Sequence, residues 1–140
     1  MDSYEAIEFS INAWEKVGFN VRALPYPQKV VFLIGWLNSE VEQGGVYGWL
    51  INMGEHGPDT VKAFEAVGAH QCATIVREIL AFFPRGTPSP DDQERVRQMI
   101  AVEDVANSYW SDLGDRLLRW PDDIDDLLHK FVAQYEADFT

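Results

Sequence analysis

Apolar side chains recur along the chain at the three- and four-residue spacing of an amphipathic helix. The first such face consists of Ile7, Ile11, Trp14 and Val17, and the last consists of Ile124, Leu127, Leu128, Phe131, Tyr135 and Phe139. Between them, the segment 27–41 is apolar almost all round, which predicts a central, buried helix. No stretch alternates between apolar and polar residues as a strand does, so we predict an all-α fold.

Glycine and proline residues interrupt this pattern at several places, namely Gly44–Gly45, Gly68, Pro84, Ser89–Pro90, Gly114 and Pro121. Helices are expected to end at the first three and to begin at Ser89–Pro90 and Pro121. At Gly114 a long helix either continues or divides into two. The sequence predicts one domain over residues 1–140, a bundle of six to eight helices in which residues 1–26 form an N-terminal helix and a linker.

Composition supports a folded, acidic protein. Of the 140 residues, 46% are hydrophobic and 13% are aromatic, which excludes intrinsic disorder. The 23 acidic residues outnumber the 11 basic ones, and the formal net charge is −12. A surface of this sign repels nucleic-acid phosphates and anionic lipids. We therefore expect no direct nucleic-acid binding, no membrane binding and a basic macromolecular partner.

Cysteine content and the chain start bear on the compartment. Cys72 is the only cysteine, so no disulfide can form within the chain, which fits a reducing compartment. The N-terminus is acidic where a secretory signal needs basic residues. The longest strongly apolar run, residues 30–37, is far shorter than the roughly 20 residues that span a bilayer. We expect a cytoplasmic protein.

The acidic residues are concentrated in the last quarter of the chain. Residues 103–140 hold ten acids and three bases, a net charge of −7 that leaves −5 for the first 102 residues. The ten acids are Glu103, Asp104, Asp112, Asp115, Asp122, Asp123, Asp125, Asp126, Glu136 and Asp138. Carboxylates three or four positions apart on a helix lie about 5–6 Å from one another. Each DNA strand places a phosphate about every 3.4 Å along its axis, on a larger radius, so a row of helical carboxylates presents negative charge at a similar pitch. We predict that these ten residues form an acidic face that binds a partner.

A structural explanation of the same charges stands beside this one. Four of the acids, Asp122, Asp123, Asp125 and Asp126, occupy the first turns of a predicted helix. The helix macrodipole stabilises an acid there by about 0.3–1 kcal/mol. A charged face also serves solubility alone. Charge pattern by itself therefore leaves both interpretations open.

A more specific pattern occupies residues Glu40–Asn52, which read EVEQGGVYGWLIN. This segment resembles the signature of the DNA-mimic-protein-nineteen-like family, a small bacterial family. The family pattern is Glu-Val-Asn-Asn-Gly-Gly-aromatic-x-Gln-aromatic, with an Asn a few residues on. Residues 63–69, 83–95 and 113–131 resemble later family segments in the same order. The resemblance covers about residues 27–139.

The resemblance implies an all-α fold and often a homodimer. It also implies an acidic surface that mimics DNA and occupies the DNA-binding surface of a basic regulator or histone-like protein. The chain departs from the family pattern at three places: Glu42–Gln43 replaces the Asn pair, Val46 replaces an aromatic residue and Gly48 replaces the glutamine.

We interpret five motif residues as structural, namely Glu40, Gly44, Gly45, Trp49 and Asn52. Glu40 is expected to accept hydrogen bonds from backbone N–H groups of the following turn, while Asn52 fastens the same turn. The glycines are expected to supply positive φ angles or close helix approach. The alternative interpretation is a ligand pocket formed by Glu40, Gln43, Tyr47 and Asn52.

The sequence contains no catalytic or metal-ligating constellation and no cofactor motif. His56, His70 and His129 are far apart, and a phosphate-binding glycine-rich loop with its lysine is absent. We therefore predict a non-enzymatic acidic interaction protein of the DNA-mimic type. The alternatives are an immunity protein that caps a basic toxin, and a small-molecule-binding protein or enzyme with a pocket near Glu40 and Asn52.

Overall fold

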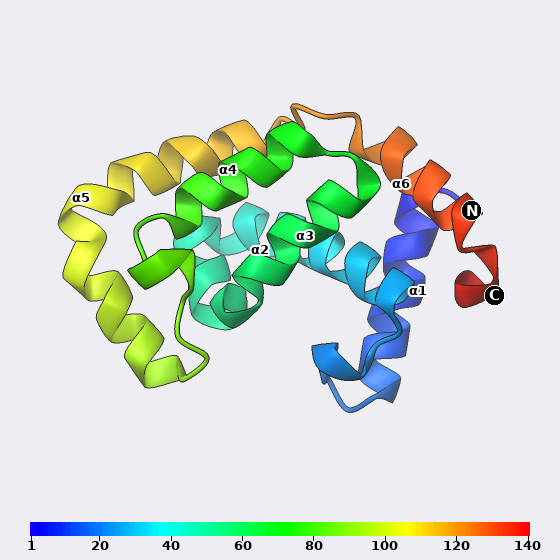
Figure 1. Cartoon of the computed structure of the whole chain (residues 1–140), viewed down its shortest axis with the longest axis horizontal. Helices are drawn as coiled ribbons and strands as arrows, with labels where there is room; N and C mark the ends of the chain where they lie inside the picture. The colour runs from blue at the N-terminus through cyan, green and yellow to red at the C-terminus, as the bar shows by residue number, and fades with distance from the viewer.

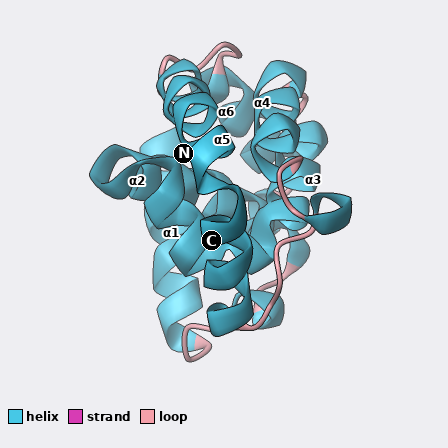
Figure 2. Ribbon diagram, turned by 90° about the vertical axis from the view of Figure 1, so that its left-hand side faces the viewer, coloured by secondary structure: helices cyan, strands magenta, loops and turns pink.

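The computed structural model describes all 140 residues and consists of helices and loops without a strand (Figure 2), so the all-α prediction is confirmed. The α-helices are α1 (Ser3–Lys16), α2 (Tyr26–Met53), α3 (Gly57–Val67), α4 (His70–Leu80), α5 (Asp92–Leu118) and α6 (Ile124–Gln134). The 3-10 helices are η1 (Val21–Ala23), η2 (Gly54–His56), η3 (Pro84–Gly86) and η4 (Glu136–Phe139). None of these helices combines the length and the hydropathy needed to cross a bilayer.

Helix α2 runs through the middle of the molecule, and α1, α3 and α5 pack against it (Figure 1). Helix α4 lies between α3 and α5, and α6 packs on α1. Figure 1 shows α5 curving around one end of the molecule, while α1, α6 and both chain ends lie at the other end. The buried apolar side chains form one contiguous core of 36 residues. The apolar segment 27–41 lies inside this core, as its pattern predicts, because α2 has neighbours on several sides.

The predicted helix end at Gly44–Gly45 is a kink within α2. Gly45 has φ 66° and ψ −175°, a combination far from helical values, and helical backbone angles resume beyond it. This backbone region is essentially restricted to glycine because a Cβ atom would clash there. The regular helix predicted to end at Gly44–Gly45 is therefore interrupted at Gly45, and a second helical segment follows within α2 as far as Met53.

Gly114 does not divide α5, which continues from Asp92 to Leu118. A Cβ atom at Gly114 would lie 3.0 Å from Cγ2 of Val46, so the glycine allows α5 to approach α2 closely. Because Gly114 does not divide α5, and the two helical segments of α2 join at Gly45, the upper part of the predicted range of six to eight helices is not reached.

Two predicted helix starts are wrong by two or three residues. Helix α5 is capped by Asp91, whose side chain accepts a hydrogen bond from the Glu94 N–H at 2.8 Å, and not by Ser89. Helix α6 is capped by Asp123, which accepts from the Asp126 N–H at 3.2 Å. In both cases an aspartate between the proline and the helix supplies the cap, because its short carboxylate reaches the free N–H groups of the first turn.

Candidate functional site

The elements that carry the ten acids of residues 103–140 follow one another along one curved edge of the molecule (Figure 1). Figure 1 shows the second half of α5 running along this edge into the loop 119–123 and then into α6. The main neighbours of α5 are α2 and α4, whereas those of α6 are α1 and α3. The two acidic helices therefore follow one another and do not form a packed pair. We call this region, with its ten acids, the acidic edge.

Most of these carboxylates face solvent. Seven are exposed: Asp104, Asp112, Asp115, Asp123, Asp125, Asp126 and Glu136. The other three, Glu103, Asp122 and Asp138, are half-buried. Glu103 lies 3.5 Å from the Tyr47 hydroxyl, which donates a hydrogen bond to it. Partial burial and the nearby Glu103 charge raise the pKa of Tyr47.

Asp122 has a structural task at the start of α4. Its Oδ2 accepts a hydrogen bond from the backbone N–H of Cys72 at 2.8 Å, and its Oδ1 lies 3.4 Å from the Gln71 amide nitrogen. The residue before α4, Ala69, provides no side-chain cap. The carboxylate from the α5–α6 loop therefore satisfies a free N–H group at this helix start. Cys72 itself is fully buried, and burial raises the pKa of its thiol to about 12.

The bases within residues 103–140 neutralise little of the acidic edge. Lys130 pairs with Asp126 at 2.8 Å, which raises the pKa of Lys130. Arg116 instead reaches α4 and pairs with Glu78 at 3.7 Å, and Arg119 forms no ion pair. Of the ten acids, only Asp126 has a cationic partner. The local negative charge therefore remains largely uncompensated.

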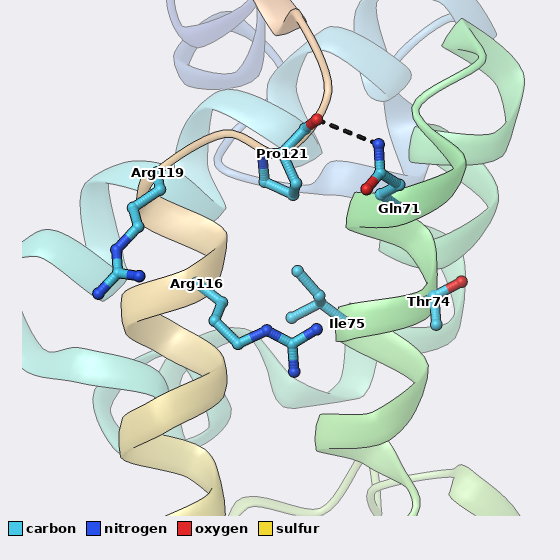
Figure 3. Close-up of a pocket in the computed structure, with 6 residues that line it drawn as sticks. All are labelled: Gln71, Thr74, Ile75, Arg116, Arg119 and Pro121. Carbon is cyan, nitrogen blue, oxygen red and sulfur yellow. Dashed lines mark hydrogen bonds between the residues drawn. The ribbon is translucent and has the colours of Figure 1, made fainter.

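A pocket of about 470 Å³ interrupts the edge where α5 ends beside α4. Its lining residues are Gln71, Thr74, Ile75, Arg116, Arg119 and Pro121. Figure 3 shows Arg116 extending toward Ile75 of α4, Arg119 directed away from α4, and Gln71 bonded to the Pro121 carbonyl at 3.2 Å. Two guanidinium groups thus stand at the junction between the acids of α5 and those of α6.

A second group of acids, which the charge pattern did not predict as part of the site, lies beside α6. Helix α1 packs against α6, and the Ser3 hydroxyl donates a hydrogen bond to Asp125. Asp2, Glu5 and Glu8 of the α1 segment are exposed and form no ion pair. More than a hundred residues separate the two groups along the chain. The sequence signal was the acidic N-terminus, but only the packing shows that the start of α1 lies beside α6.

The first and last residues of the Glu40–Asn52 motif form a side-chain hydrogen bond across the kink in α2. Asn52 donates from its amide nitrogen to Glu40 Oε2 at 3.0 Å, and the Trp36 indole N–H donates to Oε1 at 3.1 Å. Residues twelve apart in a straight helix are separated by about 18 Å, so this contact requires the change of direction at Gly45. The expected backbone donors to Glu40 are wrong, because side chains occupy its carboxylate.

The other polar groups of the alternative ligand pocket also have protein partners. The Tyr47 hydroxyl bonds Glu103, and the Gln43 amide nitrogen donates to the Ser39 hydroxyl at 3.3 Å. Trp49, the remaining motif residue, is 1% exposed and belongs to the core. Each polar side chain of the alternative ligand pocket thus has a hydrogen-bond partner within the protein.

Comparisons with known proteins identify one family. The family described as DMP19-like protein matches residues 22–135, which include the kink motif, α5 and α6. The searches of curated proteins and of solved structures found no match. Helix α1 and its acids lie outside the matched residues.

Proposed function

The chain belongs to the DMP19-like protein family, and from this we propose that it is a non-enzymatic DNA mimic. It presents the acidic edge to the DNA-binding surface of a basic protein, such as a regulator or a histone-like protein. Bound there, it prevents that protein from reaching DNA.

The observation that carries the proposal is the uncompensated charge of the acidic edge. Nine of its ten carboxylates have no cationic partner, and most of them face solvent. Asp112 and Asp115 of α5 are three residues apart, so helical geometry places their carboxylates about 5–6 Å from one another. Lysine and arginine side chains that bind phosphates find charges of the same sign at similar intervals.

Fixed positions distinguish this edge from a flexible acidic tail. Asp123 is held by its cap to α6 and Asp125 by its bond to Ser3. Because these side chains are ordered before binding, a partner loses less conformational entropy in engaging them. Exposed charges also accelerate encounter with a basic partner, and this effect weakens as salt screens it over about 8–10 Å.

The test begins with affinity capture from a lysate of the source organism at low and at high salt. A captured basic protein is then bound to a labelled DNA duplex, and the chain is added as competitor. We expect the chain to displace the DNA, and we expect the double variant Asp112→Asn/Asp115→Asn to compete at least about tenfold less well.

The matched control is Glu15→Gln/Glu42→Gln, which removes the same charge from exposed positions outside the acidic edge and outside any ion pair. Equal weakening by both pairs would show a general charge effect and contradict a specific edge. A captured partner that does not bind DNA would also contradict mimicry. A captured nuclease whose activity the chain blocks without DNA competition would favour the immunity role.

A further inference from the structure

An apolar strip on the outer side of α5 adjoins the acidic edge. Val102, Val105 and Tyr109 follow one another at three- and four-residue spacing, and 64% of Val105 and 58% of Tyr109 are exposed. Phe82, from the segment after α4, packs on Tyr109 with ring centroids 5.8 Å apart. We call these four residues the α5 strip. Val105 and Tyr109 are exposed, whereas Val102 and Phe82 are half-buried and pack against the core. Neighbouring exposed apolar side chains mark interaction surfaces more often than isolated ones do.

The surface beside the α5 strip is hollowed. A pocket of about 420 Å³ lies between the end of α4 and the first half of α5. Its apolar lining consists of Phe82, Phe83, Pro84, Ala101 and Val102. The strip therefore combines a projecting tyrosine with an adjacent apolar recess that accommodates a side chain from a partner.

Unpaired carboxylates flank the α5 strip. Asp104 precedes Val105, and Asp112 lies three residues after Tyr109 on the same side of the helix. Both are exposed and neither forms an ion pair. The two charged residues that line the recess, Arg97 and Glu94, pair with each other at 2.9 Å, so their charges cancel. The field over the strip is consequently negative.

We infer that the α5 strip binds a basic amphipathic segment of a partner protein, in which an apolar side chain is flanked by lysines and arginines. This inference rests on the proposed function and adds an apolar anchor to its electrostatic contact. Tyrosine is enriched among residues that dominate binding energy when a partner excludes water around them. The apolar side chain enters the recess beside Tyr109, while its basic neighbours reach Asp104 and Asp112.

The flanking charges disfavour a second copy of the chain as the occupant. A two-fold contact through the same strip would bring Asp104 and Asp112 of both copies together, and like charges at an interface oppose association. The strip also lies at the end of the molecule remote from α1, α6 and both chain ends (Figure 1). It thus lies beside the first acids of the acidic edge, on α5.

The test uses two synthetic peptides of equal charge and length. One is a helical 18-residue peptide with leucine on one face and lysine on the other, and the other peptide replaces each leucine by serine. Binding to the full chain is measured by fluorescence anisotropy of a labelled peptide. We expect the leucine-containing peptide to bind about tenfold more tightly, and we expect Tyr109→Ser/Val105→Ser to abolish this preference.

The control variant Tyr4→Ser alters a tyrosine that is 68% exposed on α1, and it should keep the preference. Circular dichroism confirms that each variant is folded. Unchanged preference in Tyr109→Ser/Val105→Ser would overturn the inference, as would a strip-dependent dimer of the chain in light scattering. The proposed function has a separate test. It fails if the chain does not displace DNA from the captured protein, or if Asp112→Asn/Asp115→Asn competes as well as the parent chain.

Discussion

Arg95 of α5 donates a hydrogen bond from Nε to the carbonyl oxygen of Leu50, in the last turn of α2, at 2.8 Å. Its guanidinium also donates to the carbonyls of Ile51 and Ser89, and it pairs with Asp92. The side chain is 1% exposed, so these bonds replace water completely. A cation beside the carbonyl end of a helix is favoured by the macrodipole. One buried residue therefore joins the end of α2, the loop before α5 and α5 itself.

Replacing Arg95 by alanine should destabilise the protein by about 3 kcal/mol or more, because buried carbonyl groups lose donors and a cavity remains. Arg95→Lys should recover only part of this loss, since an ammonium group does not match the fork of a guanidinium. Urea unfolding measures both variants. The control is Arg97→Ala, whose exposed ion pair with Glu94 contributes less than about 1 kcal/mol. Similar losses for Arg95 and Arg97 variants would contradict this role.

The glycine pair in α2 offers a test of the kink with matched substitutions. A Cβ atom at either glycine would meet no neighbouring group within 4 Å, so packing does not separate the two positions. Gly45→Ala should destabilise the protein by about 1–3 kcal/mol because of its positive φ. Gly44→Ala, within the helix, should be neutral or stabilising by up to about 1 kcal/mol. The measurement is the thermal unfolding midpoint of each variant. Equal midpoints for Gly44→Ala and Gly45→Ala would mean that the fold does not require the kink.

Asp122 should contribute to stability independently of any partner. Its carboxylate caps α4 through the Cys72 N–H, so Asp122→Ala should cost about 0.5–2 kcal/mol of unfolding free energy. Asp122→Asn should cost less, because the amide oxygen still accepts the hydrogen bond. Asp115→Ala is the control, since Asp115 is exposed and its loss should change stability by less than about 0.5 kcal/mol. A thiol reagent should also modify Cys72 faster in Asp122→Ala than in the parent chain, and equal rates would argue against the cap.

Because His56 is buried, we expect the folded protein to lose stability in mildly acidic solution. Burial lowers its pKa below the ordinary value of 6.5, and the neighbouring Glu55 opposes this shift more weakly. Between the unfolded pKa and the lower folded pKa, the unfolded chain binds more protons, so unfolding becomes easier as pH falls below about 6.5. Urea unfolding between pH 7.5 and 5.5 should show this slope, and His56→Gln should flatten it. The exposed His70 supplies the control, because His70→Gln should leave the slope in place.

The local sequence pattern was sufficient to predict that the fold is all-α and that the segment 27–41 forms the central, buried helix. A helix is recognised from apolar residues three and four positions apart, which are close neighbours in the sequence. A helix that is apolar on almost all sides, as residues 27–41 are, must be buried whatever the arrangement of the other helices. Charge content is likewise a property of the sequence alone. The helix starts were misplaced because several capping residues stood close together, and which of them caps depends on the exact direction in which the chain enters the helix.

Tertiary structure decided which distant groups meet. It brings Asn52 back to Glu40, directs Asp122 to the start of α4, and places the α1 acids beside α6. These relationships depend on the kink at Gly45 and on the packing of whole helices, which no short stretch of sequence encodes. The sequence alone therefore determined that this protein is helical and acidic. Only the folded arrangement determined which carboxylates remain free for a partner, because the same charged residue either serves the fold or faces water according to what lies next to it.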